Sequence, residues 1–111
     1  MEYNFELPES LETIGIGAFA QCYLESIVIP AKVKHIGWSA FSSCTNLSSV
    51  TFSEGLVSIR GNAFSSCESI KQISLPSTLK YIGEEAFEHT DLEAVSVPEG
   101  VVYVGEGAFE S

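Results

Sequence analysis

The sequence predicts an α/β repeat fold in which short strands and turns stack into a curved solenoid. Two observations carry this prediction: one dipeptide recurs at a nearly fixed spacing, and the residues around it repeat in register. The dipeptide is Ala-Phe, which occurs at Ala18-Phe19, Ala40-Phe41, Ala63-Phe64, Ala86-Phe87 and Ala108-Phe109. Successive copies are 22, 23, 23 and 22 residues apart. One repeat of this length cannot bury its apolar face alone, whereas stacked copies can.

Each repeat contains a Leu-x-x-Val-x-Ile segment that we expect to form a β-strand. The expected strands are Ser26–Ile29, Ser49–Phe52, Gln72–Leu75 and Ala94–Val97, because these runs are short, alternating and rich in β-branched residues. The alternation turns one set inward: Ile27, Ile29, Val50, Phe52, Ile73, Leu75, Val95 and Val97. It turns the other set outward: Ser26, Val28, Ser49, Thr51, Gln72, Ser74, Ala94 and Ser96.

The rest of each repeat is expected to form turns. The glycine of the recurring Ile-Gly pair permits a tight bend or a positive φ. The segment Ala-Phe-x-x-Cys is expected to make one helical turn with its Ala, Phe and Cys on the buried side. Proline follows most of the expected strands, at Pro8, Pro30, Pro76 and Pro98, since it cannot donate to a sheet. The strands would then lie parallel, about 4.8 Å apart, in one sheet.

The whole chain is expected to be a single array. It divides into a half repeat (1–6), four repeats (7–28, 29–51, 52–74 and 75–96) and a truncated repeat (97–111). It begins and ends within a repeat and shows no polar cap, although solenoids normally need caps for solubility. We therefore expect a fragment of a longer protein, or self-association through uncapped ends of the solenoid.

The charge and hydropathy exclude several classes of partner. Fifteen acidic residues against five basic ones give a net charge of −10. No basic stripe is present to bind nucleic acid or an anionic lipid surface. No apolar run approaches the roughly 20 residues of a membrane-spanning helix, so membrane insertion is not expected. Residues 1–6 also lack the basic and apolar regions of a secretory signal peptide.

The repeated pattern Leu-Pro-x-x-Leu-x-x-Ile-Gly-x-x-Ala-Phe-x-x-Cys-x-x-Leu-x-x-Val resembles the BspA-like leucine-rich repeats over essentially the whole chain. The resemblance implies a right-handed leucine-rich-repeat solenoid. A curved parallel β-sheet would form its concave side, and short helical or 3-10 turns its convex side. Proteins of this family are typically displayed on the cell surface or secreted, and some are implicated in adhesion. The family motif consists of scaffold residues, so no catalytic or binding residue carries over to this chain.

Three cysteines raise the question of a metal or redox centre. Cys22, Cys44 and Cys67 occupy the same repeat position, and Thr90 replaces the cysteine in the next copy. We expect them to form a ladder of small, buried apolar side chains. In-register side chains should point parallel to one another, which disfavours a disulfide.

No other motif indicates catalysis. His35 and His89 have no cysteine or carboxylate at ligand spacing within their own repeats, and both are expected to be solvated. The serines form no Gly-x-Ser-x-Gly elbow, and the acidic residues form no Asp-x-Asp-x-Asp-Gly calcium loop. We therefore expect no enzymatic activity, no metal and no cofactor.

The outward strand face remains as the candidate contact surface. Its residues are Ser26, Val28, Ser49, Thr51, Gln72, Ser74, Ala94 and Ser96. We expect a non-catalytic protein-interaction module of a surface-displayed or secreted adhesin-like protein, whose concave β-face contacts the ligand. The resemblance implies a protein partner, such as a host extracellular matrix component or another cell-surface protein, or a glycan.

The alternative is a structural spacer with no tight ligand of its own. The outward strand face is poor in Trp, Tyr and Arg, which commonly anchor interfaces. The larger aromatic residues are expected on loop or turn positions away from the strands. They are Tyr23, Trp38, Tyr81 and Tyr103.

Overall fold

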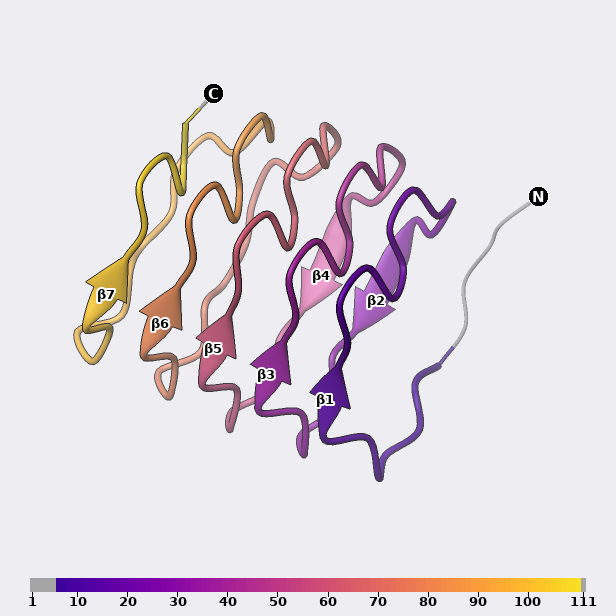
Figure 1. Ribbon diagram of the computed structural model, residues 1–111, viewed down its shortest axis with the longest axis vertical. Coiled ribbons are helices and arrows are strands. Elements are labelled where there is room, and N and C mark those ends of the chain that lie inside the picture. The colour runs from indigo at the N-terminus through magenta and orange to yellow at the C-terminus, as the bar shows by residue number, and fades with distance from the viewer. Residues whose placement is uncertain (1–5, 111) are drawn as a thin grey trace.

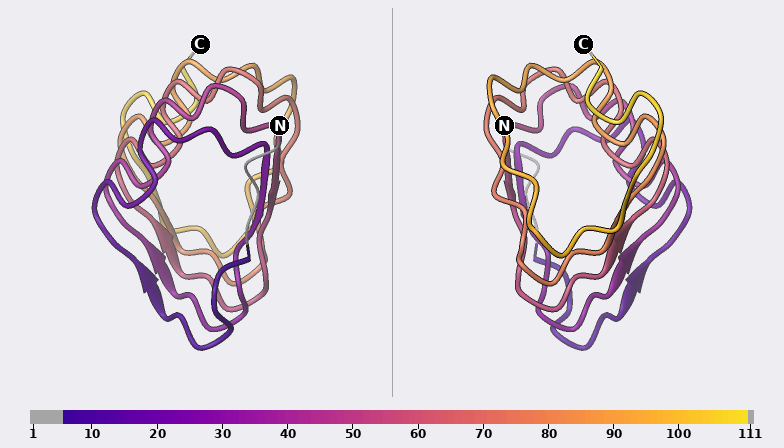
Figure 2. Two further views of the ribbon diagram at one scale, coloured as in Figure 1. Left: turned by 90° about the vertical axis from the view of Figure 1, so that its right-hand side faces the viewer. Right: turned by 90° about the vertical axis from the view of Figure 1, so that its left-hand side faces the viewer.

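The computed structural model describes residues 6–110, which wind into successive coils stacked along one axis (Figures 1 and 2). The described strands are β1 (Thr13–Ile14), β2 (Ser26–Val28), β3 (His35–Ile36), β4 (Ser49–Thr51), β5 (Ser58–Ile59), β6 (Tyr81–Ile82) and β7 (Tyr103–Val104). They form two parallel sheets, one in the order β1-β3-β5-β6-β7 and one that pairs β2 with β4. The parallel, in-register coils are those of a repeat solenoid, as the sequence predicts.

The larger sheet forms at the residues directly before the recurring glycine, where the sequence predicts only turns. Its strands end at the apolar residue of this position in each repeat, so that Ile36 lies between Ile14 and Ile59 in register. The expected positive φ is wrong, because Gly15, Gly37, Gly83 and Gly105 are not among the residues with positive φ. A turn does begin at each of these glycines, whose carbonyl accepts from the N–H group three residues later at 3.2 Å. A Cβ atom at Gly37 would instead lie 2.8 Å from the carbonyl carbon of Gly15. The glycine is needed there because neighbouring coils approach closely.

The strands expected from Leu-x-x-Val-x-Ile are only partly confirmed. β2 and β4 match the first two, whereas the described chain forms no strand over Gln72–Leu75 or Ala94–Val97. The inward residues Ile27 and Ile29 are buried, but those of the later repeats are half-buried, and Val97 is 42% exposed. Register between strands is fixed by the burial of one face. The later segments bury too little of that face to stay paired.

The expected helical turn at Ala-Phe-x-x-Cys is also wrong, since the described residues contain no helix. These segments form a turn strip, which comprises residues 17–22, 39–44, 62–67, 85–90 and 107–110. Within it Ser39 and Ser43 have positive φ angles of 57° and 61°, which interrupt any right-handed helix. The N–H groups of Ser39, Phe41 and Ser43 donate to carbonyls of the next coil at 3.0, 2.7 and 2.7 Å. In a helix these N–H groups would bond to carbonyls four residues earlier.

The core lies between the two sheets and the turn strip, and a phenylalanine ladder runs through it. The rings of Phe19, Phe41, Phe64, Phe87 and Phe109 stack with centroids 5.3, 5.1, 5.3 and 5.4 Å apart. Phe41, Phe64 and Phe87 are fully buried, as are the alanines that precede them. The predicted burial of Ala, Phe and Cys is therefore confirmed for the central coils, although the backbone that achieves it is not helical.

Candidate functional site

The predicted contact residues line most of a groove beside β4. The groove has a volume of about 1360 Å³ and is lined by residues from three successive coils. Six of the eight predicted residues line it: Ser49, Thr51, Gln72, Ser74, Ala94 and Ser96. Ser26 and Val28 lie on β2, the strand paired with β4, and are not part of the lining. All eight side chains are exposed except that of Ser26, which is half-buried. Their outward orientation is confirmed, and their role in binding stays a prediction.

The groove combines an apolar floor with a polar rim. Val50 is buried in it, and Phe52, Ile73 and Leu75 are half-buried. Exposed serine, threonine and glutamine side chains alternate with these residues, and Glu68, Lys71 and Glu93 add charge at the rim. Such a surface offers apolar contacts at alternate positions and polar groups between them.

The backbone beneath the groove is only partly paired. β4 pairs with β2 on one side. On its other side, the described residues show no backbone hydrogen bond between 49–52 and 72–75. The two coils stay in contact on either side of this stretch, where the Ser69 hydroxyl donates to the Thr45 carbonyl at 2.6 Å and the Thr78 hydroxyl donates to the Leu56 carbonyl at 2.8 Å. The coil that contains residues 72–75 is bonded to the coil after it just before residue 72. There the N–H groups of Asp91 and Glu93 donate to the carbonyls of Ile70 and Lys71, each at 3.1 Å.

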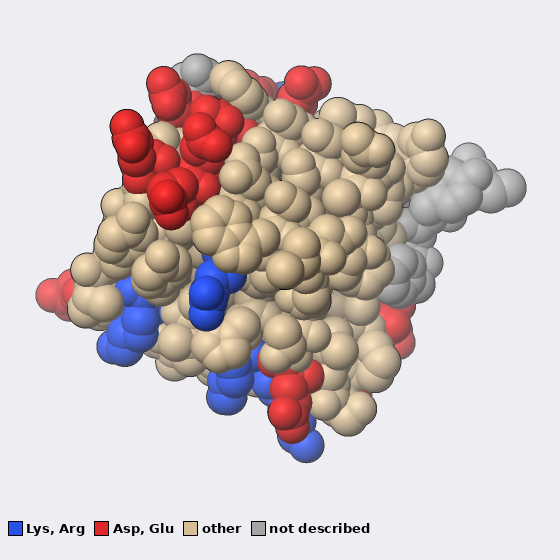
Figure 3. Space-filling model, viewed as in Figure 1, with Lys and Arg blue, Asp and Glu red and all other residues tan. Residues whose placement is uncertain are grey.

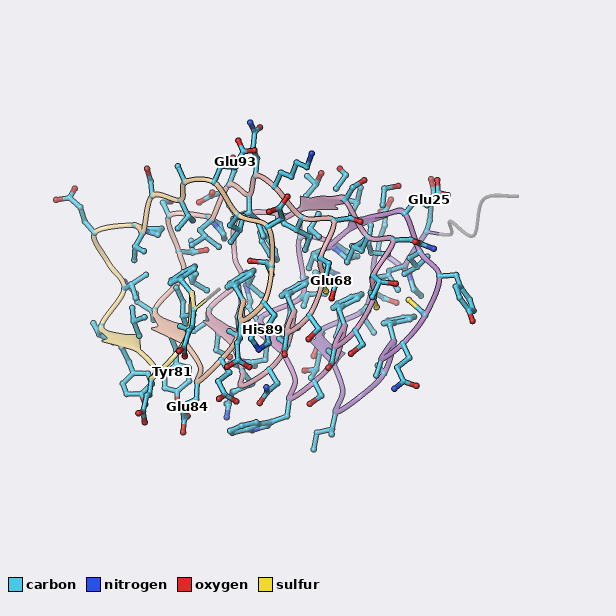
Figure 4. All side chains as sticks on the ribbon, turned by 90° about the horizontal axis from the view of Figure 1, so that it is seen from above. Glu25, Glu68, Tyr81, Glu84, His89 and Glu93 are labelled. Atoms are coloured by element: carbon cyan, nitrogen blue, oxygen red, sulfur yellow. The ribbon has the colours of Figure 1, made fainter. Side chains whose placement is uncertain are left out.

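A second surface lies on the outer face of the five-stranded sheet, on the opposite side of the molecule. Figure 4 shows Tyr81 and Glu84 on that side and Glu93, a groove residue, on the other. The expectation that Tyr81 and Tyr103 lie away from the strands is wrong, because they are in β6 and β7. Their rings stack with centroids 4.7 Å apart, and the guanidinium of Arg60 lies 5.8 Å from the centre of the Tyr81 ring.

Trp38 belongs to the same face. It follows Gly37 and is 43% exposed. Its indole covers Gly61 of the next coil, where any Cβ atom would overlap the ring. These aromatic positions could have been found from the sequence only by placing a strand on the residues before each Ile-Gly pair. The pattern at those positions is too variable to indicate one.

The cysteine ladder forms as predicted and contains free thiols. Cys44 and Cys67 are buried, and Cys22, half-buried, has its Sγ 3.3 Å from that of Cys44. The Cys44 and Cys67 thiols each donate to a phenylalanine carbonyl of the preceding coil at 3.0 Å. The hydrogen bond with Cys67 and burial raise the pKa of Cys44, and burial raises the pKa of Cys22. Both thiols are therefore held protonated, which makes them poor nucleophiles.

Each histidine has one polar neighbour among the described residues, and neither belongs to a cluster of metal-ligating groups. His35 is half-buried in β3, where its Nδ1 lies 2.7 Å from the Ser58 hydroxyl, so the expectation that it is solvated is wrong. His89 is exposed, with its Nε2 3.9 Å from a Glu88 carboxylate oxygen. Residues 6–110 contain no cluster of three side chains able to hold a metal ion. That stretch also contains no helix long and apolar enough to cross a membrane.

Comparison with known proteins identifies the repeat. The family described as BspA type leucine rich repeat region matches residues 3–111 in six copies. Comparison with curated proteins gave no match. Solved structures are similar, among them a leucine-rich repeat protein from Bacteroides ovatus, which is 38% identical with a TM-score of 0.85. That likeness covers 89% of this chain and 26% of the other.

Two further similar structures are described as a cell surface protein and as a vaccine antigen. A leucine rich cell surface protein from Faecalibacterium prausnitzii is 31% identical, with a TM-score of 0.88 over 96% of this chain and 28% of its own. The pneumococcal vaccine antigen PcpA is 38% identical, with a TM-score of 0.75 over 81% of this chain and 23% of its own. The chain thus spans about a quarter of the length of these three solved proteins. Since the family pattern covers nearly all of it, the chain belongs to the BspA-type leucine-rich repeat family.

Proposed function

We propose that this chain is a non-catalytic protein-interaction module of a surface-displayed or secreted adhesin-like protein. The observation that carries the proposal is the groove beside β4, where six predicted contact side chains alternate with apolar residues of the floor. The descriptions of the F. prausnitzii protein and of PcpA support a location at the cell surface.

The groove suits an extended segment of a protein, such as a host extracellular matrix component or another cell-surface protein. An extended segment lying in the groove would contact side chains of three successive coils. Its alternate side chains would contact Phe52 and Ile73 on the floor. The polar side chains of Thr51, Gln72 and Ser74 would face its remaining groups. A glycan is the alternative ligand, because exposed hydroxyl and amide groups also bind sugars.

A binding array tests this proposal. The immobilised chain is probed with purified extracellular matrix proteins and with a glycan panel, beside Thr51→Arg, Ser74→Arg and Ser10→Arg variants. Both groove variants should bind the captured protein at least about tenfold more weakly, because a long charged side chain obstructs the groove. Ser10→Arg, on an exposed turn outside the groove, is the control and should bind normally.

Other outcomes of this experiment would favour a glycan ligand or a structural spacer. Capture of a glycan but no protein, with the same loss in the groove variants, would replace the protein ligand with a sugar. Absence of any bound protein or glycan would favour a structural spacer. The scarcity of aromatic and arginine anchors in the groove is the observation that supports the spacer.

A further inference from the structure

The outer face of the five-stranded sheet carries an aromatic pair between two patches of opposite charge. The pair consists of Tyr81 and Tyr103, whose stacked rings belong to adjacent strands. Tyr103 is 42% exposed, so an aromatic surface is available to a partner. Exposed tyrosine next to arginine is the composition that commonly anchors protein interfaces.

The basic patch consists of Lys34, Arg60 and Lys80. All three side chains are exposed, and they lie just before β3, just after β5 and just before β6. No lysine or arginine in the described part of the chain lies within 4.0 Å of a carboxylate. Figure 3 shows Lys and Arg side chains gathered on this face, below the larger acidic region and beside a smaller group of carboxylates. Three of the five basic residues of a strongly acidic protein are therefore together and without ion-pair partners.

The acidic patch consists of Glu84 and Glu106, which follow β6 and β7. Both carboxylates are exposed. Glu84 first, and Glu106 to a lesser extent, raise the pKa of Tyr103, which places their charge next to that ring. Figure 3 shows carboxylates clustered on the same face, beyond the ends of β6 and β7. Basic patch, aromatic pair and acidic patch thus follow one another across a single surface.

We propose that two copies of this chain associate through this face about a two-fold axis near the tyrosine pair. A two-fold contact needs a surface that is complementary to itself, because each contact then occurs twice. Rotation about an axis near Tyr81 brings the basic patch of one copy onto the acidic patch of the other, in both directions. The tyrosine rings of the two copies form the apolar centre, and the charged patches form the rim that fixes the orientation.

The net charge of −10 opposes this association only at low ionic strength. At about 0.15 M salt the Debye length is about 8 Å, so the overall repulsion between two copies is largely screened. Opposite charges in direct contact across the interface are screened less. The association is therefore expected at physiological salt and should weaken toward 1 M salt.

Charge reversal combined with sedimentation equilibrium at about 0.15 M salt tests the contact. The 111-residue chain should sediment as a dimer. The basic-reversed variant (Lys34→Glu, Arg60→Glu, Lys80→Glu) and the acid-reversed variant (Glu84→Lys, Glu106→Lys) should each be monomeric, because each gives the two patches of the face the same sign of charge. Mixed together, the two variants should form a heterodimer. Lys71→Glu, on the groove face, is the matched control and should remain dimeric.

The aromatic centre gives a second readout that does not depend on charge. Tyr81→Ser should raise the dimer dissociation constant at least about tenfold, whereas Tyr23→Ser, on a turn outside this face, should leave it unchanged. A wild-type chain that stays monomeric up to millimolar concentration would overturn the proposal. So would open-ended growth into filaments, which indicates stacking of solenoid ends, or a mixture of reversed variants that stays monomeric.

Discussion

Single residues set how closely neighbouring coils approach one another. The sequence Ile59-Arg60-Gly61 looks like a copy in which the glycine has slipped by one position. The strand register shows an exchange instead, because Ile59 pairs with Ile36, so that Arg60 stands opposite Gly37 and Gly61 opposite Trp38. Gly61 has no side chain, and the Trp38 indole occupies that space.

Gly61→Ala should therefore displace the only tryptophan of the chain. The added Cβ would overlap the indole, which lies at the surface and can swing away. We expect a shift of Trp38 fluorescence to longer wavelength and a loss of stability of about 1 kcal/mol. Gly15→Ala is the control, since a Cβ there meets no atom within 4 Å. Identical emission spectra for wild type and Gly61→Ala would contradict this account of Gly61.

At the scale of the elements, the sequence predicted which side chains are buried better than it predicted the backbone. The phenylalanine and cysteine ladders follow from identical spacing in every copy, which needs no knowledge of hydrogen bonding. The backbone conformation of the turn strip could not be predicted from the spacing, because its N–H groups bond to residues one coil away. The left-handed positions were signalled only by small or polar residues such as Ser39 and Asn62, which adopt this conformation more readily than most residues.

Of the two candidate contact surfaces, the groove could be predicted from the sequence and the face of the five-stranded sheet could not. Alternation placed Thr51 and Ser74 outward, and they are exposed. Tyr81 and Tyr103 were missed because a two-residue strand is too short to show alternation. Only the pairing of five such strands across the stack identifies that face as a sheet.

The phenylalanine ladder predicts a large effect of a central substitution. Phe64 is fully buried between Phe41 and Phe87, and Phe52 contacts it edge-on at 5.9 Å between centroids. Phe64→Ala should leave a cavity and lower the free energy of unfolding by about 3–5 kcal/mol in a denaturant titration. Phe19→Ala, at a half-buried position of the same ladder, should cost clearly less. Equal losses for the two variants would mean that the ladder does not bury its centre.

At the scale of the whole molecule, stability should be uneven across the stack. Coils contact only their neighbours in such arrays, so local opening depends on local burial. The face that carries β2 and β4 is well buried in the earlier coils and half-exposed in the later ones. The five-stranded sheet, in contrast, continues across all five coils.

Amide hydrogen exchange should show this difference within one molecule. The N–H group of Ile29 donates to Thr51 at 2.8 Å, whereas the equivalent N–H group of Leu75 has no backbone acceptor within the described chain. We expect Ile29 to exchange at least about a hundredfold more slowly than Leu75. The sheet supplies the control pair, Gly37 and Gly105, whose N–H groups bond at 2.7 and 2.8 Å and should be protected to a similar degree. Equal exchange of Ile29 and Leu75 would contradict the uneven stack.

The hydrogen bonds of the turn strip give the stack a net dipole along its axis. The N–H groups of Ser39, Phe41 and Ser43 all point toward the next coil, and the carbonyls that they meet point back. Peptide dipoles aligned in this way add along the stacking axis as they do along a helix, with the positive pole toward the later coils. The carboxylates of Glu88 and Glu110 lie in those later turns, whereas Lys34 and Arg60 lie in earlier coils. These carboxylates thus lie near the positive pole of the backbone dipole, and these basic side chains lie nearer its negative pole. Each added coil would lengthen that dipole.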